Sequence, residues 1–74
     1  MTTTKTMIQA LRTEAAEAGD SEQVAICDRA LGGEADAWET CALVIDEARA
    51  MLDGKNDRGS EHASVRRAAK IISE

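Results

Sequence analysis

The chain contains few side chains of the types that catalyse reactions or bind metals. Two cysteines, Cys27 and Cys41, and a single histidine, His62, are spread over 74 residues. Zinc sites take their ligands from compact spacings, and these three residues match none of those patterns. No serine or cysteine pairs recognisably with His62 as a nucleophile with its base. We therefore expect no catalytic residue, no metal site and no cofactor, and we do not expect an enzyme.

A group of acidic residues in the stretch 34–53 can mediate binding instead. At helical spacing, one sector of this stretch contains Asp36, Glu39, Leu43, Asp46 and Glu47. A leucine surrounded by charge can form the centre of a protein interface, because interfaces have an apolar core and a polar rim. Two simpler explanations remain open. Asp36 and Glu39 can form a helix-capping box, and single exposed leucines are common.

A basic cluster near the C-terminus is the other candidate site. The net charge is −5, but residues 55–74 carry more basic than acidic side chains. Arg66, Arg67 and Lys70 share the outer face of the helix expected there. Such a cluster can bind phosphates or a carboxylate-rich partner. Basic residues in a last turn also complement the helix dipole, and the segment can pack back on the acidic body or meet a second molecule.

The elements that position these residues are expected to be helices. Proline, tyrosine and phenylalanine are absent, while strong helix formers such as alanine, leucine and glutamate are frequent. We predict one all-α domain over residues 1–74, a small three- to four-helix bundle with a polar tail at 1–5 and a basic C-terminal helix within 55–74. The third helix, about 34–53, is expected to be central because its apolar face is broad. That face contains Trp38, Cys41, Ala42, Ile45, Ala48 and Leu52.

Capping signals predict where the helices begin and end. Residues that fit N-terminal capping boxes occur at Thr6–Gln9, Asp20–Gln23 and Asp36–Glu39, and Ser60 is the expected N-cap of the last helix, about Glu61–Ser73. The first helix is expected to reach about Ala18 and the second to cover about Ser21–Leu31. Gly19, Gly32-Gly33 and Gly54 are natural helix ends.

Composition also limits the location and the ligands. No run approaches the ~18 apolar residues of a membrane helix, and no export segment is evident at the N-terminus. We expect a cytoplasmic protein whose cysteines are reduced and act as small apolar residues. An acidic chain is not expected to bind nucleic acid directly. If helix two, the turn and helix three formed a DNA-binding helix-turn-helix, the start of its recognition helix would carry Glu34, Asp36 and Glu39, which phosphates repel.

The segment Leu11–Leu31, LRTEAAEAGDSEQVAICDRAL, resembles part of short, largely uncharacterised proteins of proteobacteria and their phages. Their pattern is roughly LRxEAxxAGDxxxVxICxxAL, and Gly32-Gly33 and Cys41 match its continuation. The resemblance extends over about Ile8–Ala50 and excludes the segment after Gly54. It implies a helix–turn–helix scaffold and a mobile-element context, but no chemistry. Small acidic phage proteins are often inhibitors of host systems, and this chain is similar to anti-CRISPR proteins in size and charge.

These observations lead to one expected function and two alternatives. We expect a phage- or prophage-encoded protein that inhibits a host protein. The acidic helix face would dock on the site where the host protein normally holds nucleic acid. The first alternative is an oligomeric binder, or sponge, of an anionic small ligand such as a nucleotide, held by Arg66, Arg67 and Lys70. The second is a homodimer with a structural role.

Overall fold

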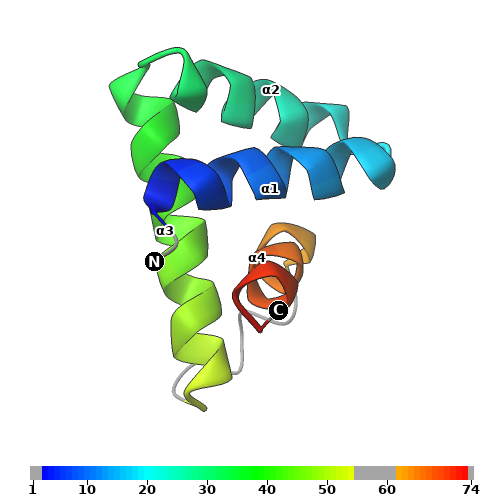
Figure 1. Ribbon diagram of the computed structural model, residues 1–74, viewed down its shortest axis with the longest axis vertical. Helices are drawn as coiled ribbons and strands as arrows, with labels where there is room; N and C mark the ends of the chain where they lie inside the picture. The colour runs from blue at the N-terminus through cyan, green and yellow to red at the C-terminus, as the bar shows by residue number, and fades with distance from the viewer. Residues whose placement is uncertain (1–2, 55–61, 74) are drawn as a thin grey trace.

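Four α-helices make up the part of the chain that the computed structural model describes, residues 3–54 and 62–73 (Figure 1). In chain order they are α1 (Thr4–Glu17), α2 (Ser21–Leu31), α3 (Ala35–Leu52) and α4 (Ala63–Ser73), and the same residues contain no strand. The radius of gyration is 11.3 Å, close to the value of about 11 Å expected for a compact domain of this length. The predicted all-α helical bundle is confirmed.

The helices pack in a ring rather than around one central helix. α1 and α2 lie side by side, run in opposite directions and cross α3, while α4 packs on α1 and α3 (Figure 1). The main contacts follow the order α1, α2, α3, α4 and back to α1, and α1 touches α3 only slightly. The expected central position of helix three is therefore not confirmed. Its broad apolar face is shared between two neighbours, α2 and α4.

The core draws on all four helices, and its largest members come from α1. Ile8 and Leu11 are completely buried, and Val65 of α4 is 1% exposed. Cys27 of α2 and Cys41 of α3 complete the set of largest fully buried side chains. α1 therefore buries more apolar side-chain surface than its mostly polar sequence suggests.

α1 begins earlier than the capping box at Thr6–Gln9 predicted. Its N-cap is Thr3, whose hydroxyl oxygen accepts a hydrogen bond from the backbone N–H of Thr6 at 3.2 Å. Several threonines in this region can serve as the cap, and the first turn that Thr3 adds leads directly into the buried Met7. Thr4 and Lys5 accordingly belong to α1 and not to a polar tail.

The turn between α1 and α2 was predicted correctly. Gly19 has φ +76°, a conformation that glycine adopts without strain. The backbone N–H of Asp20 donates to the carbonyl of Ala15 at 2.9 Å, which closes the end of α1. Asp20 then caps α2, because its carboxylate accepts from the backbone N–H of Gln23 at 3.2 Å. One short turn thus ends α1 and starts α2 at the expected residues.

α3 begins at Ala35, and the prediction that Asp36 caps it is wrong. Its N-cap residue is Glu34, which makes no side-chain capping bond. Glu34 is fixed in two other ways: its N–H donates to the carbonyl of Arg29 at 3.0 Å, and its carboxylate lies 3.1 Å from the Arg29 guanidinium. The chain therefore enters α3 directly after Gly33 ends α2, and Asp36 lies within the first turn.

The two ends of the predicted apolar face of α3 differ in burial. Ala37, Cys41, Ile45 and Ala48 are buried, and Trp38 is half-buried against the core. Leu52, which we expected on the same face, is 47% exposed. The reason is positional, because the last turn of α3 extends beyond α1 and α2 (Figure 1).

α4 is shorter than predicted within the described residues. It begins at Ala63, and the expected cap Ser60 and first residue Glu61 lie outside the part of the chain that the structure describes. Val65, Ala68 and Ala69 form its buried face, while Ile72 is only half-buried.

Candidate binding surfaces

One exposed face of α3 contains all five residues of the predicted acidic sector. We call this surface the acidic face, and it consists of Asp36, Glu39, Leu43, Asp46 and Glu47, each of which is exposed. Positions three, four and seven residues apart lie on one side of a helix, and the opposite side of α3 is the one buried in the core. The helix therefore presents these residues together, as the sequence pattern predicted.

Leu43 is the most exposed large apolar side chain in the described part of the chain. It is 63% exposed, and the next is Leu52 at 47%. The two differ in their surroundings, because Leu43 lies between acidic residues in the middle of α3 and Leu52 lies in its last turn. Leu43 contributes little to the core, so the structure gives it no packing role.

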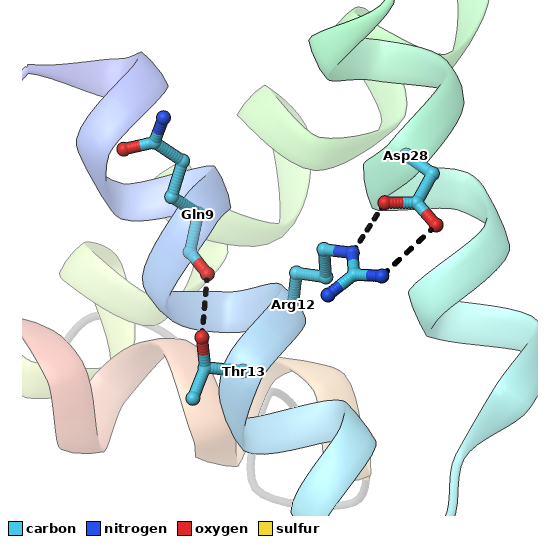
Figure 2. A network of polar contacts seen from close by, with 4 residues as sticks. All are labelled: Gln9, Arg12, Thr13 and Asp28. Carbon is cyan, nitrogen blue, oxygen red and sulfur yellow. Dashed lines mark hydrogen bonds and ion pairs between the residues drawn. The ribbon is translucent and has the colours of Figure 1, made fainter.

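Most cations that the structure describes are paired away from the acidic face. Arg12 of α1 binds Asp28 of α2 through two hydrogen bonds, from Nε to Oδ1 and from Nη2 to Oδ2, the second at 3.4 Å (Figure 2). These two bonds link α1 to α2. The same view shows the hydroxyl of Thr13 donating to the carbonyl of Gln9 at 3.2 Å, within α1.

The acidic face itself is hardly neutralised. Within the described residues its ion pair is with Arg49, whose Nη1 lies 3.8 Å from Asp46, with both side chains at least half exposed. An exposed pair at this distance contributes little free energy. Asp36, Glu39 and Glu47 form no ion pair within residues 3–54 and 62–73. The face therefore keeps its negative charge.

The basic residues of α4 largely turn toward the body of the protein. Nη1 of Arg67 lies 2.8 Å from Oδ2 of Asp20 and 2.7 Å from Oε1 of Gln23, and the Arg67 side chain is only 18% exposed. Lys70 lies 3.2 Å from the Glu14 carboxylate. Arg66 is exposed. Of the possibilities left open by the sequence, the structure shows the basic helix packed on acidic residues of α1 and α2.

Gln23 has a role that the capping box did not predict. Its backbone N–H donates to Asp20, as that box requires, but the residue is 7% exposed and its side-chain carbonyl oxygen accepts from Arg67. A signal for its burial exists in the sequence. Gln23, Cys27 and Ala30 follow one another at spacings of four and three, and all three are buried in α2.

Removing the guanidinium of Arg67 should destabilise the fold. Arg67→Ala leaves the buried carbonyl of Gln23 without its donor and breaks the link from α4 to α2. We expect the free energy of unfolding to fall by about 1–3 kcal/mol, and for a domain of this size each kcal/mol lowers Tm by roughly 4–8 °C. Thermal unfolding followed by circular dichroism measures the change. An unchanged Tm would show that the link carries no stability.

The same link makes stability sensitive to acid. The hydrogen bond from Arg67, and then that from the backbone N–H of Gln23, hold the pKa of Asp20 below its ordinary value of 3.8. As the pH falls, Asp20 is protonated in the unfolded chain before it is protonated in the folded chain. The contribution of Asp20 to stability is therefore complete above its ordinary pKa and is lost as the pH falls through its lowered pKa in the folded protein. Asp20→Asn keeps a capping side chain and serves as the control, since it should lose less stability than the wild type on acidification.

The two cysteines are free thiols in the core, between α2 and α3. Burial, together with the neighbouring Cys41, raises the pKa of Cys27 to about 12. Burial also raises the pKa of Cys41. Because the thiolate is the reactive form of cysteine, neither residue has the properties of a nucleophile.

His62 is exposed, and no three His, Cys, Asp or Glu side chains in residues 3–54 and 62–73 are grouped so that they could hold a metal ion.

None of the helices in these residues has the length and hydrophobicity that a membrane span requires.

Comparison with known proteins adds no assignment. No protein-family model matches the chain, and neither the curated proteins nor the solved structures include a match.

Proposed function

We propose that this chain is a non-enzymatic binding protein that docks the acidic face of α3 on a basic surface of a partner protein. The single observation that carries the proposal is Leu43, an apolar side chain 63% exposed among acidic residues that are hardly neutralised. A surface of this kind offers an apolar centre and a charged rim, which is the composition of a protein interface.

Energetics supports Leu43 as the centre of this interface. Complete burial of a leucine side chain yields about 1.5–3 kcal/mol, and folding leaves most of that free energy unused at this position. A partner with an apolar pocket would gain it on binding. The carboxylates around Leu43 add attraction to a basic partner, which mainly accelerates association and selects the partner.

The proposed partner is a host protein whose basic surface normally binds nucleic acid. Carboxylates spaced along one helix face can occupy cationic sites that otherwise hold phosphates, so docking would exclude the nucleic acid by competition. Together with the resemblance of Leu11–Leu31 to phage proteins, this leads us to propose a cytoplasmic inhibitor of a host system, with anti-CRISPR activity as the example. The alternative function, binding of an anionic small ligand by the basic helix, has less support. Arg67 and Lys70 are paired with carboxylates of the protein itself and are less available to such a ligand.

Truncation of Leu43 tests this proposal. The immobilised protein should capture its partner from a host lysate, and mass spectrometry should identify it. In a titration of the purified partner, Leu43→Ala should weaken binding by roughly tenfold or more, because central interface residues often contribute more than 1 kcal/mol.

Leu52→Ala is the matched control, since it is the same substitution at another exposed position of α3. It should leave the affinity unchanged. Equal affinities of both variants and the wild type would overturn the proposal that Leu43 is the interface centre.

A further inference from the structure

A groove runs along the junction of α2 and α3. A hollow of about 280 Å³ lies where α2, α3 and the start of α4 meet, and a second of about 250 Å³ lies toward the N-terminal end of α3. Ile26 and Thr40 line both hollows. The two hollows are therefore neighbours, and we call them together the groove.

Apolar and acidic side chains both line the groove. Ile26 and Val44, both half-buried, line the larger hollow, and the buried Ala37 lines the smaller one, whose lining is mostly polar. Two carboxylates of the lining, Glu22 in the larger hollow and Asp36 in the smaller one, form no ion pair within the described residues.

Three other charged groups among the described lining residues are held in ion pairs. Asp20 is paired with Arg67 at 2.8 Å, and Glu34 is paired with Arg29 at 3.1 Å. His62 also lines the larger hollow. Among the described residues that line it, the groove therefore combines apolar contact area with two carboxylates outside any ion pair, Glu22 and Asp36.

Gln23 adds a hydrogen-bond donor to the larger hollow. Its Oε1 is occupied by Arg67, whereas its Nε2 donates to no side chain or backbone group of the described residues. No fully buried side-chain nitrogen or oxygen in these residues lacks a partner. The Nε2 of Gln23 is therefore not fully buried. Because Gln23 lines the larger hollow, this amide is the donor that the chain offers to a carbonyl oxygen placed there.

We propose that this groove binds a short extended segment of the partner protein in which a lysine or arginine stands next to an apolar residue. The inference rests on the proposed function and names the part of the partner that is recognised. The apolar residue packs on Ile26 and Val44, the cation lies beside Glu22 in the larger hollow, and a backbone carbonyl accepts from Gln23.

The groove adjoins the acidic face at Asp36, which lines the smaller hollow and belongs to the acidic face. A basic segment seated in the groove would leave the rest of the partner in position to cover Leu43. Both surfaces carry carboxylates, so both are complementary in charge to a basic partner. This complementarity favours a basic protein segment as the occupant of the groove.

Nuclear magnetic resonance with a model peptide tests this inference on the full chain. The probe is an acetylated tetrapeptide that alternates leucine with lysine, and the control peptide alternates leucine with glutamate. At millimolar concentration and low salt, the basic peptide should shift the amide signals of Glu22 and Ile26 on α2, and the acidic peptide should not. Glu22→Gln should raise the Kd by about two- to fivefold, and the matched change Glu17→Gln should not alter it.

The outcomes separate this inference from the proposed function. Shifts confined to Asp46 and Glu47 would overturn the groove inference and leave docking through the acidic face in place. The absence of any shift would also overturn the groove inference, whereas the proposed function is judged independently by the Leu43→Ala titration. If the basic peptide shifts the signal of Ile26 but binds Glu22→Gln as tightly as the wild type, the Glu22 carboxylate does not hold the cation. That result would contradict the inference.

Discussion

Replacing Leu11 by alanine should remove a large part of the stability of this protein. Leu11 is completely buried, and substitutions of this kind cost about 2–5 kcal/mol because they remove apolar contacts and leave a cavity. A domain of this length has a total stability of about 4–11 kcal/mol. Chemical denaturation followed by circular dichroism should therefore show a much lower midpoint, and the variant should be partly unfolded at elevated temperature.

Leu43→Ala is the matched control for this experiment, because it makes the same substitution at an exposed helical position. Its effect should stay within about 0.5 kcal/mol. The comparison tests the ring of helices directly, since in the ring α1 supplies the largest fully buried side chains of the core. A loss at Leu11 that is no larger than the loss at Leu43 would contradict the packing of α1 described above.

Reversing the charge of Asp46 and Glu47 should abolish partner binding while the fold is retained. The double variant Asp46→Lys/Glu47→Lys brings like charges together at a basic partner surface, which costs several kcal/mol, so we expect affinity to fall by roughly a hundredfold or more. Lysine is a strong helix former, and both positions are exposed. Titration of the captured partner measures the loss, and circular dichroism verifies the fold.

The matched control is Glu17→Lys/Asp53→Lys, which changes the net charge equally but at the ends of α1 and α3. Positive charge is favourable near a helix C-terminus, so this variant should fold normally. Its affinity should fall far less than that of the first pair. If both pairs weaken binding to the same extent, total charge would account for the interaction and the acidic face would have no special role.

Much of the helical layout could be predicted because its signals are local. Asp20 after Gly19 predicted the turn between α1 and α2, since a left-handed glycine ends one helix and a carboxylate caps the next. The start of α1 was wrong because several threonines can serve as the cap, and only the packing of Met7 distinguishes between them. The exposure of the acidic face followed from the 3.6-residue period of a helix and was predicted correctly.

The features that could not be predicted depend on contacts between distant helices. The position of Arg67 against Asp20 and Gln23 joins residues more than 40 positions apart, and no local pattern encodes that meeting. The exposure of Leu52 depends on where the neighbouring helices end rather than on its own periodicity. The groove between α2 and α3 likewise exists only after Ile26 and Thr40 have been brought together.

The most direct test of docking through the acidic face is to map the interface on the labelled protein in complex with its captured partner. In ¹⁵N spectra, the account predicts that the largest signal changes occur at Glu39, Leu43 and Glu47, while exposed residues of α1 such as Gln9 remain unaffected. Changes centred on Gln9 or on α4, with Leu43 unchanged, would contradict it and would place the binding surface elsewhere.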